Sequence, residues 1–223
     1  HFSKRFLDET YFVPFKACIE RGGSRSIMTA YNSFDGSPCS ANNWLLNDIL
    51  KNEWGFKGFV ISDASGTGGA NVLHYTAKNY PDAGKKAVEN GLDVIFQTDY
   101  NHYKLFQPPF LDGTIDQKII DNAVKRVLKA KFELGLFDNP YILEKIDPLH
   151  ASDPLAIAKK AALESIVLLK NKNELLPLST SKKIALIGED AANVRLGGYS
   201  GPGHQNISIL EGLKQFFGEK ISY

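Results

Sequence analysis

Apolar residues recur with helical spacing in four segments of the first part of the chain: residues 8–21, 43–50, 81–90 and 115–134. Three short runs rich in branched and aromatic residues lie between these segments, at residues 26–31, 59–61 and 92–96. Each run predicts a strand, and a predicted helix follows each strand. This order favours parallel strands joined by helical crossovers, which is the pattern of an α/β fold.

A second pattern begins after an irregular segment at residues 139–154, which contains Pro140, Pro148 and Pro154. Proline-rich, irregular stretches are typical of connections between domains. Beyond it, the spacing predicts a helix over residues 156–164, strands over 166–169 and 183–188, and a helix over 208–217. We therefore predict one domain over residues 1–138, a linker over 139–154 and a second domain over 155–223.

Composition leaves the predicted fold unchanged, but it argues against two kinds of partner, nucleic acid and a membrane. The 223 residues contain 26 lysines and arginines and 25 aspartates and glutamates, so the net charge is only +1. Such a balance gives no field that would collect nucleic acid. No apolar run reaches the roughly 18 residues of a membrane span. The first residues lack the apolar segment of a signal peptide, and the chain has no initiating methionine. We expect it to be an internal part of a longer protein.

The segment with the clearest chemistry is Gly55-Phe-Lys-Gly-Phe-Val-Ile-Ser-Asp63, a short apolar strand that ends in a carboxylate. In β/α barrels the catalytic groups stand at the carboxyl ends of the strands, where loops form an open mouth. A carboxylate at such a position can attack, accept a proton or bind a cation. Taken alone, Asp63 could equally cap a loop or a helix.

Several ordered motifs resemble glycoside hydrolase family 3, which includes retaining β-glucosidases and β-xylosidases. The Asp63 segment is similar to the nucleophile motif of that family. Further similarities occur in order along nearly the whole chain: Ser3–Glu9 with Pro14-Phe15, Ser26–Asn32, Gly36–Asn42, Gly91–Asp93, Val124–Phe137, and Glu164–Asn171 with Leu176–Leu178.

The resemblance implies a fold and a role for particular residues. It implies the last three strands of a (β/α)8 TIM-like barrel, with five strands before His1, followed by the start of an α/β sandwich domain. Asp63 matches the family's catalytic nucleophile. Tyr31 matches a tyrosine at the end of the preceding strand, whose hydroxyl we expect to hydrogen-bond the Asp63 carboxylate. Met28 is expected to line the same sugar-binding pocket.

The implied reaction is exo-acting hydrolysis of terminal β-linked glucose or xylose, from an oligosaccharide or aryl β-glycoside. It proceeds through a covalent intermediate on Asp63 and requires neither metal nor cofactor. Neither a nucleic-acid partner nor a membrane is expected. The family favours a periplasmic or secreted location. The chain alone is expected to be inactive.

Two features leave the identity of the substrate open. Ala64 stands where the family commonly has a tryptophan that shapes the first sugar site. No residue matches the general acid, which we expect outside this chain. Three alternatives therefore remain: a non-catalytic carbohydrate-binding relative, a member of the N-acetylglucosaminidase branch, and a β/α barrel with other chemistry.

Overall fold

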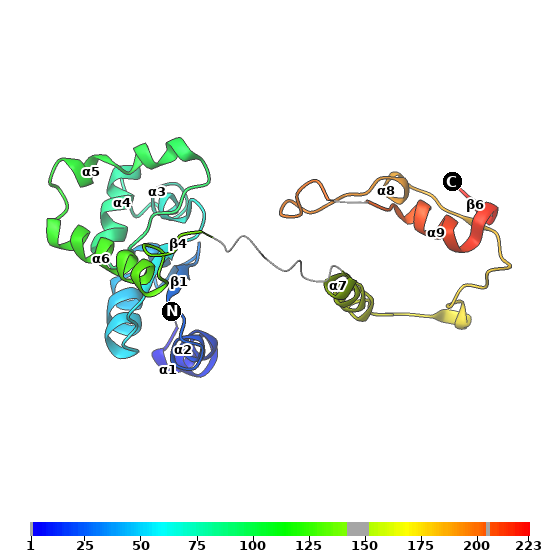
Figure 1. Ribbon diagram of the computed structural model, residues 1–223, viewed down its shortest axis with the longest axis horizontal. Coiled ribbons are helices and arrows are strands. Elements are labelled where there is room, and N and C mark those ends of the chain that lie inside the picture. The colour runs from blue at the N-terminus through cyan, green and yellow to red at the C-terminus, as the bar shows by residue number, and fades with distance from the viewer. Residues whose placement is uncertain (1, 142–151, 204–205) are drawn as a thin grey trace. The chain divides into compact units, whose positions relative to one another are not determined.

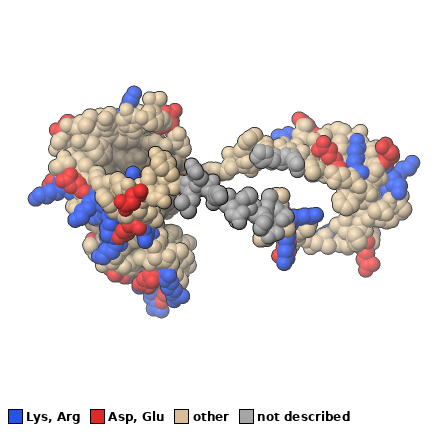
Figure 2. All heavy atoms as spheres, viewed as in Figure 1, with Lys and Arg blue, Asp and Glu red and all other residues tan. Residues whose placement is uncertain are grey.

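A computed structural model describes residues 2–141, 152–203 and 206–223 (Figure 1). The chain divides into two compact units, residues 1–144 and 145–223. On the face seen in Figure 2, basic and acidic side chains are interspersed and form no large region of one sign. Within the described part of the chain, no helix is both long enough and apolar enough to cross a membrane.

The first unit contains one parallel strand pair with helices beside it (Figure 1), where the sequence pattern predicted three parallel strands. The helix predicted over residues 8–21 begins earlier, at Lys4, and includes a π-helical stretch. The elements in order are α1 Lys4–Phe6, η1 Leu7–Tyr11, α2 Phe12–Glu20, β1 Ser26–Thr29, β2 Ser33–Phe34, β3 Ser37–Pro38, η2 Cys39–Ala41, η3 Trp44–Glu53, β4 Phe59–Ser62, η4 Gly66–Gly68, α3 Gly69–Val72, α4 Tyr80–Glu89, η5 Tyr100–Leu105, α5 Pro108–Leu111 and α6 Gln117–Glu133.

Strands β1 and β4 pair in parallel, with Ser26 opposite Phe59 and Thr29 opposite Ser62. Val60 is fully buried in a core that it shares with leucines of η3 and with Ala87 of α4. Gly58 permits the close approach of the two strands, because a Cβ atom there would lie 2.1 Å from the Arg25 carbonyl oxygen. The parallel register places the carboxyl ends of both strands at the same edge.

The strand predicted over residues 92–96 forms only a single bridge, between Val94 and Ile61. At two positions beside β4, a side-chain oxygen accepts the hydrogen bond that a backbone carbonyl would accept in a regular parallel ladder. The Asp93 carboxylate accepts a hydrogen bond from the Val60 N–H at 2.8 Å, and the Ser62 hydroxyl accepts one from the Phe96 N–H at 2.9 Å. The backbone still runs beside β4, but the ladder is too interrupted to form a regular strand.

Asp93 is also the centre of a buried charge cluster. Its side chain is 1% exposed and lies 2.8 Å from Arg126 Nη1 and 3.7 Å from Lys51 Nζ. Lys51 also donates to the Gly91 carbonyl oxygen. Burial lowers the pKa of Lys51 to about 8, although the nearby Asp93 carboxylate acts in the opposite direction. The cluster joins η3, α6 and the 92–96 segment to β4.

The second unit contains a parallel pair of two-residue strands, β5 and β6, joined through helices. The predicted helix over residues 208–217 is confirmed, and Ser208 and Glu211 form a capping box at its start. The strand predicted over residues 166–169 was wrong. These residues are exposed coil and have no strand partner within the described residues, so the apolar run alone cannot form a sheet. The elements are α7 Ser152–Glu164, η6 Lys172–Glu174, β5 Ile184–Ala185, α8 Glu189–Ala192, α9 Ile209–Phe217, η7 Gly218–Lys220 and β6 Ile221–Ser222.

Candidate active site

Asp63 follows β4 directly and lies on the side of the sheet away from the buried core. Along β4, Val60 and Ser62 are fully buried, whereas Phe59 and Ile61 are partly exposed. Because successive side chains of a strand point to opposite faces, Asp63 continues the face of Ile61. The carboxylate is therefore partly exposed at the carboxyl end of a central strand, where a ligand can reach it.

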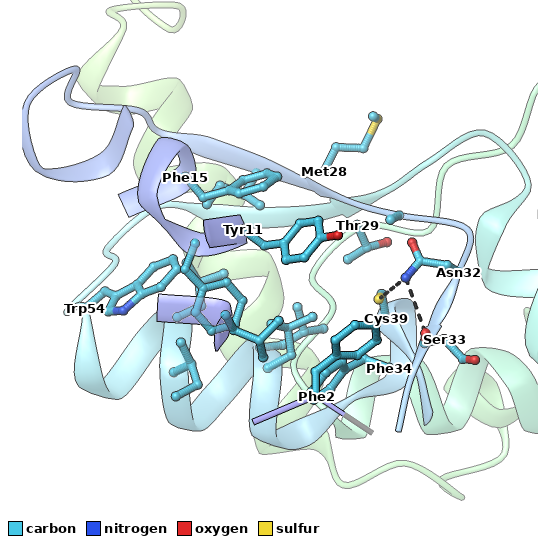
Figure 3. A pocket seen from close by; sticks show the side chains of 18 residues that line it. Phe2, Tyr11, Phe15, Met28, Thr29, Asn32, Ser33, Phe34, Cys39 and Trp54 are labelled. Carbon is cyan, nitrogen blue, oxygen red and sulfur yellow. Dashed lines mark hydrogen bonds between the residues drawn. The ribbon is translucent and has the colours of Figure 1, made fainter. Parts of the chain in front are cut away.

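Met28 lies on the same face, because β1 places it opposite Ile61 in the parallel register. Ile61, its partner in the register, precedes Asp63 by two residues. The Met28 side chain is 56% exposed. In Figure 3 its side chain projects away from Phe2, Phe34 and Trp54. The structure thus brings Met28 and Asp63 to one face of the strand pair.

The backbone ladder changes register immediately after Asp63. The Ser62 N–H donates to the Val94 carbonyl oxygen at 2.9 Å, as a parallel ladder requires. The next such bond would come from Ala64, but Ser65 donates to the Phe96 carbonyl oxygen instead, at 3.0 Å. This one-residue shift has the effect of a β-bulge, which commonly re-aims a side chain beside an active site.

The shift frees the Ala64 N–H to donate to Asp63 Oδ1 at 2.6 Å. The carboxylate is therefore fixed by the peptide group that follows it. Among the described residues, Oδ2 accepts no hydrogen bond. The Ala64 N–H thus holds one of the two carboxylate oxygens in place.

The shift depends on Ser65, whose φ of 59° lies in the left-handed region. Valine at this position would place a branched Cβ in a conformation that L-residues with side chains avoid, whereas glycine adopts it readily. We expect Ser65→Val to lower the free energy of unfolding by about 1–3 kcal/mol and to reduce turnover. Ser65→Gly should change stability by less than about 1 kcal/mol.

Chemical unfolding and turnover assays of both variants check this prediction. The matched control is Ser33→Val, because Ser33 lies on the exposed strand β2, where a branched side chain is well tolerated. Equal stability losses for Ser65→Val and Ser33→Val would contradict the role of the left-handed conformation.

Tyr31 lies beside Asp63 and contacts the same loop. Its hydroxyl donates to the Ala64 carbonyl oxygen at 2.8 Å. The sequence predicted that this hydroxyl would donate to the Asp63 carboxylate. In the structure the acceptor is instead the backbone carbonyl of the next residue, Ala64. A phenol has a single proton and cannot donate to both oxygens at once. A Cβ atom on Gly66 would lie 3.6 Å from the Tyr31 ring and 3.6 Å from Asp63 Cβ, which shows how closely the loop follows both residues.

His74 is a residue of this site that the sequence did not indicate. Its Nε2 lies 2.7 Å from the backbone carbonyl oxygen of Tyr31. The two residues are 43 positions apart, and a lone histidine in a loop carries no recognisable motif. The end of β1 is thus attached to the segment after β4 at two points, the Tyr31 hydroxyl and the Tyr31 carbonyl.

A hollow of about 420 Å³ lies elsewhere in the first unit, between α2, η3 and β1 (Figure 3). Its lining is mostly aromatic and aliphatic and includes Met28, Tyr11 and Phe34, but neither Asp63 nor Tyr31. No aspartate or glutamate is among the residues that line it. The described residues also contain no group of three or more side chains arranged to hold a metal ion.

Comparison with known proteins identifies the family. The model of the glycosyl hydrolase family 3 N-terminal domain matches residues 1–130, and the model of the family's C-terminal domain matches residues 166–222. The chain belongs to glycoside hydrolase family 3. The predicted resemblance is confirmed, and so is an α/β fold.

Individual members of family 3 align with almost the entire chain. A β-xylosidase of Formosa agariphila is 37% identical over 99% of this chain and 33% of its own length. A periplasmic β-glucosidase of Salmonella typhimurium is 34% identical, covering 99% of this chain and 30% of its own. The solved structure of a β-glucosidase from Listeria innocua in complex with glucose superimposes with a TM-score of 0.77 at 33% identity, covering 99% of this chain and 31% of that one. This chain therefore spans about a third of the length of these relatives.

Proposed function

We propose that the chain is part of a retaining glycoside hydrolase that removes terminal β-linked glucose or xylose. Family membership supports the reaction class. The observation that carries the proposal for this chain is the Asp63 carboxylate, which one peptide N–H orients at the end of β4. One relative is named a β-xylosidase and another a β-glucosidase, and these names support glucose and xylose as the two candidate sugars.

Asp63 acts as the nucleophile in this mechanism. Its ionised carboxylate attacks the anomeric carbon as the bond to the leaving oxygen breaks, which forms a covalent glycosyl-enzyme. A second carboxyl group, or the equivalent acid, gives its proton to the leaving oxygen, and water then attacks the intermediate. We place that general acid outside residues 1–223. Tyr31 and Met28 contribute to the sugar site.

The proposal includes a domain assignment. Residues 1–138 would be the last strands and helices of a (β/α)8 barrel, residues 139–154 a linker, and residues 155–223 the start of an α/β sandwich. The parallel β1–β4 pair with its crossover helices supports the barrel, and the β5–β6 pair supports the sandwich. A periplasmic or secreted location is supported by the name of the Salmonella relative.

A covalent trap tests the proposal directly. The full-length protein is treated with a 2-deoxy-2-fluoro-β-glucoside that carries a dinitrophenyl leaving group, and in parallel with its xylosyl counterpart. The fluorine slows both steps, and the activated leaving group reduces the need for the general acid. We expect a glycosyl adduct on the peptide that contains Asp63. An adduct on another carboxylate would refute the assignment of Asp63, and no adduct with either reagent would refute the proposed activity.

A further inference from the structure

The loop between β4 and α4 contacts Tyr31 at two atoms, the side-chain hydroxyl and the backbone carbonyl oxygen. The hydroxyl of Tyr31 donates to the carbonyl oxygen of Ala64, at the start of the loop. The backbone carbonyl oxygen of Tyr31 lies 2.7 Å from Nε2 of His74, which follows α3 within the same loop. One contact fixes the tip of the ring, and the other fixes the peptide from which the side chain projects.

The direction of the His74 contact follows from its chemistry. A carbonyl oxygen can only accept a hydrogen bond, so Nε2 must carry the proton and donate. This requirement selects one of the two neutral tautomers, or the doubly protonated ring. The imidazole therefore has a defined orientation with respect to the end of β1.

The chain around His74 is arranged to hold it in that place. The His74 N–H donates to the Gly69 carbonyl oxygen at 2.9 Å, at the first residue of α3. Two residues further on, both the N–H and the hydroxyl of Thr76 donate to the Ala70 carbonyl oxygen. Tyr75 between them has a φ of 54°, in the left-handed region. The segment thus folds back on α3 in a conformation that an ordinary loop would avoid.

The contact lies close to the carboxylate of Asp63. Ala64 accepts the Tyr31 hydroxyl through its carbonyl oxygen and donates its own N–H to Asp63 Oδ1. Movement of Tyr31 would therefore displace Ala64, the residue whose N–H orients the carboxylate. Because attack on an anomeric carbon requires precise alignment, a displacement of about 1 Å can lower a rate by about a hundredfold.

We infer that His74 is a positioning residue for the proposed glycosidase reaction: it holds the Tyr31 peptide, and through Tyr31 the orientation of Asp63. In this inference His74 acts through Tyr31, and we assign it no direct part in the reaction. The inference rests on the proposed function, because its consequence is a rate.

The test compares His74→Leu with His74→Gln in the full-length protein. Leucine removes the donor, whereas the carboxamide N–H₂ of glutamine can reach the position of Nε2 and donate to the same carbonyl oxygen. We expect His74→Leu to lower kcat for an unactivated β-disaccharide by about ten- to a hundredfold, with KM changed by less than about threefold. His74→Gln should recover kcat to within about threefold of wild type.

Three outcomes distinguish the possibilities. Wild-type kcat in His74→Leu, or equal losses in both variants, would overturn the donor role of His74 while leaving the proposed function intact. A wild-type protein that hydrolyses no β-glycoside would overturn both. If His74→Leu fails to fold, as shown by thermal unfolding, His74→Glu replaces it, because an ionised carboxylate offers no proton. Equal activities of the glutamine and glutamate variants would then refute the inference.

Discussion

Replacing Asp63 by asparagine is expected to lower kcat for β-glycosides by at least about a thousandfold, or about 4 kcal/mol in the activation free energy. An amide oxygen is too weak a nucleophile to form the glycosyl-enzyme. The fold should survive, because the amide oxygen of the Asp63→Asn variant can still accept the Ala64 N–H that now binds Asp63 Oδ1. Steady-state hydrolysis of an aryl β-glycoside by the full-length protein, together with thermal unfolding, measures both expectations.

The control is Asp112→Asn, which makes the same chemical change at an exposed turn where the carboxylate bonds Thr114. It should retain turnover within about twofold.

A second experiment uses the Asp63→Gly variant with added azide and an activated glycoside. Azide would enter the space left by the carboxylate, attack the anomeric carbon and give an inverted α-glycosyl azide. More than about a tenth of wild-type kcat in Asp63→Asn, less than about 1.4 kcal/mol, would rule Asp63 out as the nucleophile.

The largest effect on stability is expected for Asp93→Asn. The change removes the only negative charge in contact with Lys51 and Arg126 among the described residues. Breaking a buried ion pair by neutralising one partner typically costs about 3–5 kcal/mol, because the other charge remains buried without compensation. Arg126 is a third exposed, so a loss of about 3 kcal/mol is the more reasonable expectation.

Denaturant unfolding of the chain, followed by tryptophan fluorescence, measures this loss. Both tryptophans, Trp44 and Trp54, lie in the first unit and pack against its core clusters. Asp121→Asn is the matched control, since Asp121 is exposed on α6 and bonds only Gln117 in the described structure. It should shift the free energy of unfolding by less than about 0.5 kcal/mol. If the two variants unfold at the same denaturant concentration, Asp93 does not hold the first unit together.

Local sequence signals were sufficient where a neighbouring residue decides the structure. The helix predicted over residues 81–90 forms as α4, since Asn79 caps its first turn and Gly91 follows its end with a φ of 109°. The position of Asp63 at a strand end followed from the apolar run before it. In both cases the deciding residues are adjacent in the chain.

The signals failed where the deciding partner is distant. The Asp93 carboxylate replaces a ladder bond to Val60, 33 residues away, and this replacement shortened the predicted strand over residues 92–96. The contact between His74 and Tyr31 has no counterpart in residue spacing. The left-handed conformation of Ser65 was equally invisible, because serine has no special preference for it. The run at residues 166–169 had the composition of a strand but not the partner that a strand requires.

Ala64 and His74, both in the loop that follows β4, donate or accept the hydrogen bonds described above for Asp63 and Tyr31. Ala64 contributes only backbone atoms to these contacts, its carbonyl oxygen to Tyr31 and its N–H to Asp63. The side chain at this position, which the family resemblance links to the first sugar site, can therefore change without removing either hydrogen bond. Engineering of sugar preference in the proposed glycosidase can begin at Ala64.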